Sequence, residues 1–160
     1  MNRTLLGRSA LLAAAAALWM SSTVQAAGPY QFFSVTPCRI VDTRNPPGVT
    51  GGPALASGST RSFPIDVAPA ACGVPSTAKA AVLNVTLVAP SLDGFLSIWP
   101  FNTPAPLVST INAAAGEPAI ANGAIVPLTV DLNFNISLIY GTAVSGGSAH
   151  VILDVTGYFQ

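Results

Sequence analysis

Short runs of alternating apolar and polar residues, separated by proline and glycine, constrain the fold of this chain more than any other feature. Residues 83–87 (LNVTL) and 132–138 (LNFNISL) show the clearest alternation. A period of two places successive side chains on opposite faces of a strand, so we expect one face to lie in a core and the other in water. No long segment has the 3.6-residue period of an amphipathic helix.

The 14 prolines and 14 glycines divide the chain into many short strands. The Asp93-Gly94 pair predicts a hairpin turn, and residues 45–59 (NPPGVTGGPALASGS) predict an extended, mobile loop. The pattern favours an all-β fold, an antiparallel β-sandwich or jelly-roll-like domain of about nine short strands. We expect these strands at 32–35, 39–44, 61–67, 80–88, 95–99, 107–112, 124–129, 132–140 and 149–158.

Residues 1–26 have the pattern of a secretory signal peptide. Two arginines precede a short apolar run at 11–20, and residues 24–26 (VQA) resemble a cleavage site with small residues. The apolar run is shorter than a membrane span requires. We therefore expect a signal peptide at 1–26, a single β-sandwich domain at 27–160 without a transmembrane segment, and export to the periplasm or the extracellular space.

Cys38 and Cys72 are the two cysteines of the chain. An even number of cysteines in an exported protein predicts a disulfide. The bond would close a loop of about 34 residues, for which chain entropy predicts roughly 3–4 kcal/mol of stabilisation. We consider free thiols and metal ligation less favoured, because two cysteines without a nearby histidine do not complete a zinc site.

Charged residues are scarce, at 8% of the chain. The predicted mature part has four basic and six acidic residues, a net charge of −2. It lacks the basic patch that nucleic acids and anionic membranes require, so we expect neither as a partner. An uncharged surface is poorly protected against association. It is either simply exposed to solvent or partly buried against copies of the chain or another partner.

Two motifs near the ends of the predicted domain resemble a module of secreted bacterial proteins. The module begins with TPxRxxDTR and ends with DVxGYF, and here these motifs read TPCRIVDTR at 36–44 and DVTGYF at 154–159. The resemblance implies a β-rich, secreted, disulfide-closed domain without an assigned activity, found alone or attached to extracellular hydrolases and surface proteins. The chain departs from the module at 129–134 (TVDLNF), where a glycine-bearing hairpin turn is expected. The resemblance also covers 72–75 (CGVP), 83–86 (LNVT), 94–100 (GFLSIWP) and 109–112 (STIN).

Arg39, Asp42 and Arg44 cluster in the first motif of a chain that has few charges. On a regular strand Asp42 and Arg44 share a face and Arg39 lies on the other. We expect these residues, with Asp154 of the last motif, to form a partly buried ion network that holds the first motif to another strand. A site for a carboxylate or for sugar hydroxyls is the second interpretation, and a catalytic role is the third.

Three aromatic residues are candidates for a ligand platform. Trp99 and Phe101 flank a proline at a strand end, and Tyr140 lies near the end of a later strand. Exposed rings at such positions could stack on sugar rings. The alternative is that Trp99 fills the sandwich core, as large aromatic side chains usually do.

These patterns together predict a secreted, non-catalytic structural or adhesive module at the cell surface or in the extracellular matrix. Its partner would be a second copy or a cell-surface or glycan ligand. A carbohydrate-binding module that uses the exposed aromatics is the alternative. A small extracellular hydrolase ranks last, because no GxSxG elbow presents a serine and His150 lies roughly 13 Å along a strand from Asp154. We expect no cofactor and no bound metal.

Overall fold

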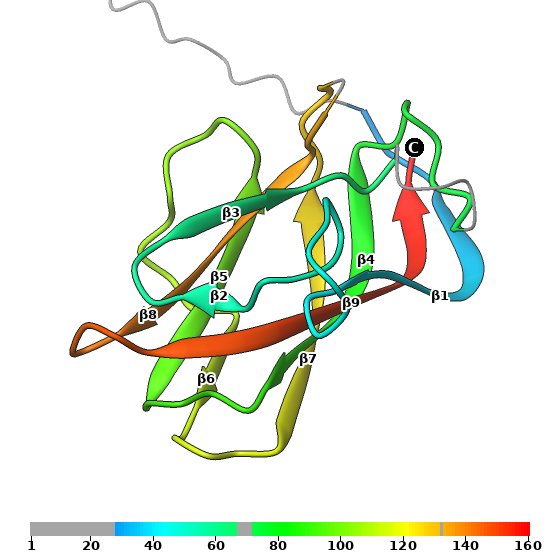
Figure 1. Cartoon of the computed structure of the whole chain (residues 1–160). Coiled ribbons are helices and arrows are strands. Elements are labelled where there is room, and N and C mark those ends of the chain that lie inside the picture. The colour runs from blue at the N-terminus through cyan, green and yellow to red at the C-terminus, as the bar shows by residue number, and fades with distance from the viewer. Residues whose placement is uncertain (1–27, 67–71, 132) are drawn as a thin grey trace, which may run out of the picture.

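Nine β-strands in two antiparallel sheets make up the structure, a computed structural model that describes residues 28–66, 72–131 and 133–160. No helix occurs in these residues. The two sheets form a sandwich (Figure 1), which confirms the expected fold class. The first sheet contains β1 (Phe32–Asp42), β2 (Leu55–Ala56), β4 (Ala80–Val88), β7 (Ala119–Pro127) and β9 (Ser148–Phe159). The second contains β3 (Thr60–Phe63), β5 (Gly94–Pro100), β6 (Ile111–Ala113) and β8 (Ile136–Thr142).

The first sheet places the two ends of the domain side by side. Its strand order is β1-β9-β4-β7, with β2 added at the start of β9, and the order of the second sheet is β3-β8-β5-β6. Phe32 at the start of β1 pairs with Phe159 at the end of β9. The first and last sequence motifs are therefore neighbours in space (Figure 1).

The core lies between the inner faces of the two sheets. On β4 the alternation of the sequence is preserved, and Leu83, Val85 and Leu87 are almost completely buried. Leu96 of β5 and Leu138 of β8 face them from the second sheet. The predicted period of two thus positions the core correctly on the long, regular strands.

The outer face of β8 is buried, although the alternation in its sequence predicts that this face is exposed to water. Ser137 is 4% exposed, and its hydroxyl lies 2.9 Å from the hydroxyl of Ser62 on β3. Asn135, just before β8, is 1% exposed, and its amide accepts hydrogen bonds from the backbone N–H groups of Ile65 and Asp66 and donates one to the carbonyl of Thr129. Both polar side chains can be buried because each has hydrogen-bond partners, a hydroxyl for Ser137 and backbone groups for Asn135.

The loop at 45–59 is folded rather than extended and mobile. Its backbone makes tight turns, and Leu55 enters the core as part of β2. The guanidinium of Arg61 donates to four carbonyl groups of this loop, those of Gly48, Gly51, Gly52 and Pro53. The prediction was wrong because prolines and glycines signal a turn but do not reveal a distant side chain that organises it.

Two predicted turns have a different form in the structure. Asp93-Gly94 does not form a hairpin, since β4 and β5 belong to different sheets and the connection crosses between them. At 129–134 the carboxylate of Asp131 accepts hydrogen bonds from the backbone N–H groups of Asn133 and Phe134. An aspartate side chain thus closes the corner where the resembled module has a glycine-bearing turn.

A disulfide joins Cys38 on β1 to Cys72, which precedes β4, with 5.4 Å between their Cα atoms, as the sequence predicts. The predicted signal peptide at 1–26 lies outside the described residues. Among the residues that are described, we find no helix long and apolar enough to cross a bilayer.

Candidate functional site

A β-bulge on β1 brings the charged residues of the first motif to one face of the sheet. Arg39 pairs with Asp154 on β9, but the register shifts before Val41, which leaves Ile40 as an extra residue. The extra residue moves the alternation by one position, so Arg39 and Asp42 project on the same side. The prediction that they lie on opposite faces was wrong, because regular alternation does not anticipate a bulge.

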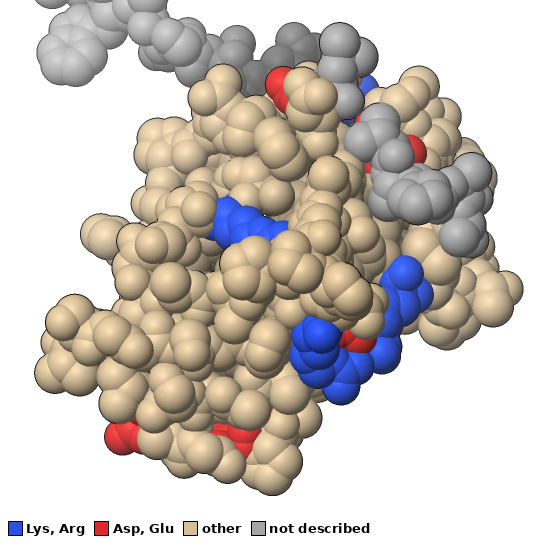
Figure 2. All heavy atoms as spheres, in the orientation of Figure 1, with Lys and Arg blue, Asp and Glu red and all other residues tan. Residues whose placement is uncertain are grey.

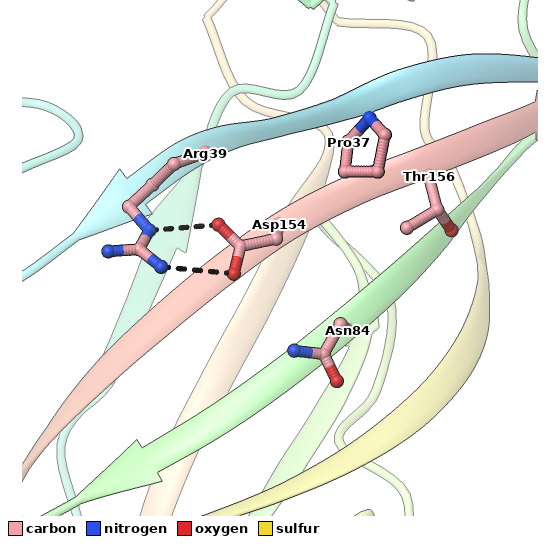
Figure 3. Close-up of a pocket in the computed structure, with 5 residues that line it drawn as sticks. All are labelled: Pro37, Arg39, Asn84, Asp154 and Thr156. Carbon is pink, nitrogen blue, oxygen red and sulfur yellow. Dashed lines mark hydrogen bonds and ion pairs between the residues drawn. The ribbon is translucent and has the colours of Figure 1, made fainter.

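Arg39 and Asp154 form a two-pronged ion pair between β1 and β9 (Figure 3). The Arg39 Nε atom lies 2.8 Å from Asp154 Oδ1, and a terminal nitrogen lies 3.2 Å from Oδ2. The hydrogen bond that the Arg39 guanidinium donates to the Asp154 carboxylate raises the pKa of Arg39. The Arg39 side chain is 49% exposed, so solvent screens much of this attraction.

Asp42 is the buried centre of the ion network. Its side chain is 6% exposed and accepts three hydrogen bonds from Arg44, from the backbone N–H at 3.1 Å and from two guanidinium nitrogens at 2.8 and 2.7 Å. Arg39 adds a longer contact of 3.4 Å. These hydrogen bonds, led by those of the Arg44 side chain, lower the pKa of Asp42 to about 2, although burial opposes the shift. The four residues of the expected ion network therefore do come together.

An open hollow of about 510 Å³ lies on the outer face of the first sheet, beside the Arg39–Asp154 pair. Figure 3 shows its lining. Asn84 lies opposite Asp154 in the β4–β9 register, and Thr156 occupies the irregularity where that register shifts. Pro37 completes the lining. The hollow offers a guanidinium, a carboxylate, an amide and a hydroxyl in one row, which can exchange hydrogen bonds with a polyhydroxylated ligand.

Sequence reasoning missed Asn84 and Thr156 as members of this hollow. Alternation indicated that Asn84 faces outward, but only the pairing of β4 with β9 brings it beside Asp154. The hydroxyl of Thr156 donates to the backbone carbonyl of Val82 at 3.3 Å, a bond across that same pair. The proximity of Asn84 and Thr156 to Asp154 could have been predicted only if the order of the strands in the sheet had been known.

His150 contacts the first motif and not the Asp154 carboxylate. Its Nδ1 atom lies 3.1 Å from the hydroxyl and 3.0 Å from the carbonyl oxygen of Thr43. The same hydroxyl bonds with the backbone of Val151 on β9. His150 thus belongs to a set of contacts that joins the end of the first motif to β9.

The three aromatic candidates do not form an exposed platform. Tyr140 is completely buried in the core and its hydroxyl donates to the carbonyl of Leu92. Trp99 is on the opposite, outer face of the second sheet, is 6% exposed and donates from Nε1 to the carbonyl of Thr103 at 3.1 Å. Phe101 packs against Phe134, with 5.3 Å between ring centroids. Trp99 is buried as the alternative expected, but beneath the segment 101–110 and outside the main core.

Two residues of the same segment and one residue of β5 form an exposed apolar cluster, which we define as Phe95, Leu107 and Val108. Leu107 is fully exposed and Val108 is 68% exposed. Together with Pro106 they line a hollow of about 350 Å³. The hydroxyl of Ser97 donates to the carbonyl of Val108 at 2.5 Å, so the cluster is held on a fixed backbone.

No group of three metal-ligating side chains occurs among the residues that the structure describes. Comparisons with protein families, characterised proteins and solved structures found no match to this chain.

Proposed function

We propose that this protein is an exported, non-catalytic module with a structural or adhesive role at the cell surface or in the extracellular matrix. The observation that carries the proposal is the apolar cluster of Phe95, Leu107 and Val108. Contiguous exposed apolar surface marks contact sites for other molecules. A fully exposed leucine on an ordered backbone needs little rearrangement to enter a partner.

The scarcity of charge in the protein supports contact through apolar surface. Figure 2 shows a face on which uncharged surface surrounds a few separate charged spots. Arg39 and Arg44 are already paired with carboxylates of the chain. Binding should therefore depend weakly on salt, because few free charges take part.

The chemistry of the ionisable side chains supports a non-catalytic role. Asp42 is held as a carboxylate by Arg44, and its pKa of about 2 is the reverse of what a general acid at neutral pH requires. His150 is engaged with Thr43. The Cys38–Cys72 disulfide supports export, because such bonds persist in oxidising compartments.

The test is retention of the purified protein on the washed cell envelope and insoluble matrix of the producing cells. Leu107→Ser should lower the retained fraction severalfold, with little change when salt is raised. Val49→Ser is the matched control, since Val49 is 66% exposed but lies outside the cluster. Equal retention of wild type and Leu107→Ser, or failure of the wild type to be retained, would contradict the proposal.

Carbohydrate binding is the second candidate, supported by the polar hollow at Arg39, Asn84 and Asp154 rather than by the aromatic residues. A glycan array tests it, with Asn84→Ala as the variant because Asn84 lines the hollow without joining the ion pair. Binding by the wild type that is lost in Asn84→Ala, with unchanged thermal stability, would favour this candidate.

A further inference from the structure

The free edge of β7 differs from the other sheet edges of the described chain. At the opposite edge of the first sheet, β1 has two register irregularities and carries Pro37 and Arg39. In the second sheet the edge strands β3 and β6 are only four and three residues long. β7 has nine residues in unbroken register with β4. Natural proteins usually shorten, bend or charge an exposed edge or place proline in it, and the only such device in β7 is Pro127 at its last position.

The backbone groups that β7 leaves free can be assigned from its ladder. At one end the N–H of Leu128 donates to the carbonyl of Lys79, and at the other end the N–H of Ala89, just after β4, donates to the carbonyl of Pro118. Antiparallel alternation then directs the even-numbered residues of β7 toward β4 and the backbone groups of the odd-numbered ones away from it. The described residues supply no hydrogen-bond partner for these outward groups. They belong to Ala119, Ala121, Gly123 and Ile125.

The side chains of these residues leave the edge accessible. All four residues are exposed, and Ile125 is 64% exposed. A Cβ atom added at Gly123 would meet no other atom within 4 Å. No charged residue occurs in β7, so nothing repels a second uncharged strand.

We propose that β7 pairs with β7 of a second copy, antiparallel across a two-fold axis. The first sheets of the two copies then join into one continuous sheet. This inference rests on the structural role proposed above and names its partner. With the axis at Asn122, Ala119 lies opposite Ile125 of the second copy and Ala121 lies opposite Gly123. Every outward N–H of the edge then meets a carbonyl. Shifting the register by two residues toward the end of β7 would bring Pro127, which has no N–H, into the ladder opposite Ala119.

The charges that flank β7 favour this pairing. Glu117 precedes the strand, and Lys79 lies beside Leu128 just after it. Antiparallel pairing places Glu117 of each copy at the end where the second copy has Lys79. Each end of the joined sheet therefore carries one Glu117 and one Lys79, with the end of a β7 strand between them, whereas a parallel pairing would place like charges together.

Cysteine cross-linking tests the register. Asn122 is opposite itself across the axis at a non-hydrogen-bonded position, where Cα atoms lie about 4.5 Å apart, within the range of a disulfide. Mild oxidation of Asn122→Cys should give a covalent dimer, since Cys38 and Cys72 are already joined. Ala119→Cys is the control, because its two copies would lie roughly 20 Å apart at about 3.4 Å per residue. Equal cross-linking of both variants, or none, would overturn the register.

Sedimentation equilibrium of the unlinked protein tests the interface independently. The wild type should reach twice the chain mass as concentration rises. Ile125→Lys should remain at the chain mass, whereas Val144→Lys, at a turn residue of 62% exposure, should behave as the wild type. A wild-type monomer, or a dimer that Ile125→Lys leaves intact, would refute the β7 pairing. Sedimentation and envelope retention together separate the two proposals. A wild type that is monomeric in sedimentation but retained on the envelope would refute only the β7 pairing. A wild type that is dimeric but washes off the envelope would refute only the adhesive role.

Discussion

Arg39 on β1 and Asp154 on β9 face each other and form two hydrogen bonds, 115 residues apart in the sequence. This contact joins the motif that begins the domain to the motif that ends it. Cys38, next to Arg39, is tied to Cys72. The first motif is therefore held on one side by a covalent bond and on the other by an ion pair.

A double-mutant cycle of Arg39→Gln and Asp154→Asn should show a coupling free energy of about 0.5–1 kcal/mol. The value is small because Arg39 is half-exposed and solvent screens the pair. Urea unfolding of the two single variants and the double variant measures it. Strict additivity of the three would mean that the pair does not stabilise the fold.

Asp42→Asn should reduce the acid sensitivity of the fold. Hydrogen bonds from Arg44 lower the pKa of Asp42 from 3.8 to about 2, so the carboxylate stabilises the folded state above about pH 4. That stabilisation, about 1–2 kcal/mol after allowing for the exposed guanidinium, is lost as the pH falls toward 2. Unfolding free energies measured between pH 6 and 2 should fall less steeply in Asp42→Asn than in the wild type.

Glu117→Gln, measured at a dilution that keeps the protein monomeric, is the control for this measurement, since Glu117 takes part in none of the described ion pairs. Its stability should follow the wild-type pH dependence. Identical profiles for Asp42→Asn and Glu117→Gln would show that the Asp42 network does not act on stability.

Gly157→Ala should destabilise the β1–β9 pair by about 1–3 kcal/mol. An added Cβ atom would overlap the ring of Phe32 and lie 2.7 Å from the carbonyl oxygen of Phe33. The exposed ring can move, but the Phe33 backbone is fixed by its pairing with β9. This close approach explains the glycine of the last motif in physical terms.

Gly123→Ala is the matched glycine control, because its Cβ atom would enter open space. Thermal and urea unfolding should place Gly123→Ala within about 0.5 kcal/mol of the wild type. A Gly157→Ala variant as stable as this control would mean that β1 can move away from β9 at little cost.

Replacing both cysteines by serine should lower the free energy of unfolding by roughly 3–4 kcal/mol. The disulfide closes a loop of 34 residues and thereby restricts the unfolded chain. Urea unfolding of Cys38→Ser/Cys72→Ser against the wild type measures the difference. Alkylation without reductant should label no cysteine in the intact protein, and two labelled cysteines would contradict the assignment.

The alternation of apolar and polar residues correctly predicted a strand where the residues of that strand alone determine it. β4 was expected at 80–88 and lies there, because its alternation of leucine and valine with polar residues is uninterrupted. β7 was expected at 124–129 but begins at Ala119. Residues 119–123 (AIANG) have weak strand propensity and become a strand by pairing with β4, which a local pattern does not reveal.

The site was predictable to the extent that its residues cluster in the sequence. Arg39, Asp42 and Arg44 are close along the chain and do form a network, but their arrangement depends on a bulge. Trp99 and Tyr140 were grouped by residue type, and the strand alternation places them on opposite faces of one sheet. Asn84 joined the site only through the pairing of β4 with β9.

We propose that the polar residues of the two motifs hold the fold together, while apolar surface makes the contacts with other molecules. Envelope retention of Leu107→Ser and Asp154→Asn, measured side by side on folded protein, tests it most directly. We expect Leu107→Ser to lose retention and Asp154→Asn to keep it. Loss of retention in Asp154→Asn with full retention in Leu107→Ser would contradict the claim and place the contact at the polar hollow.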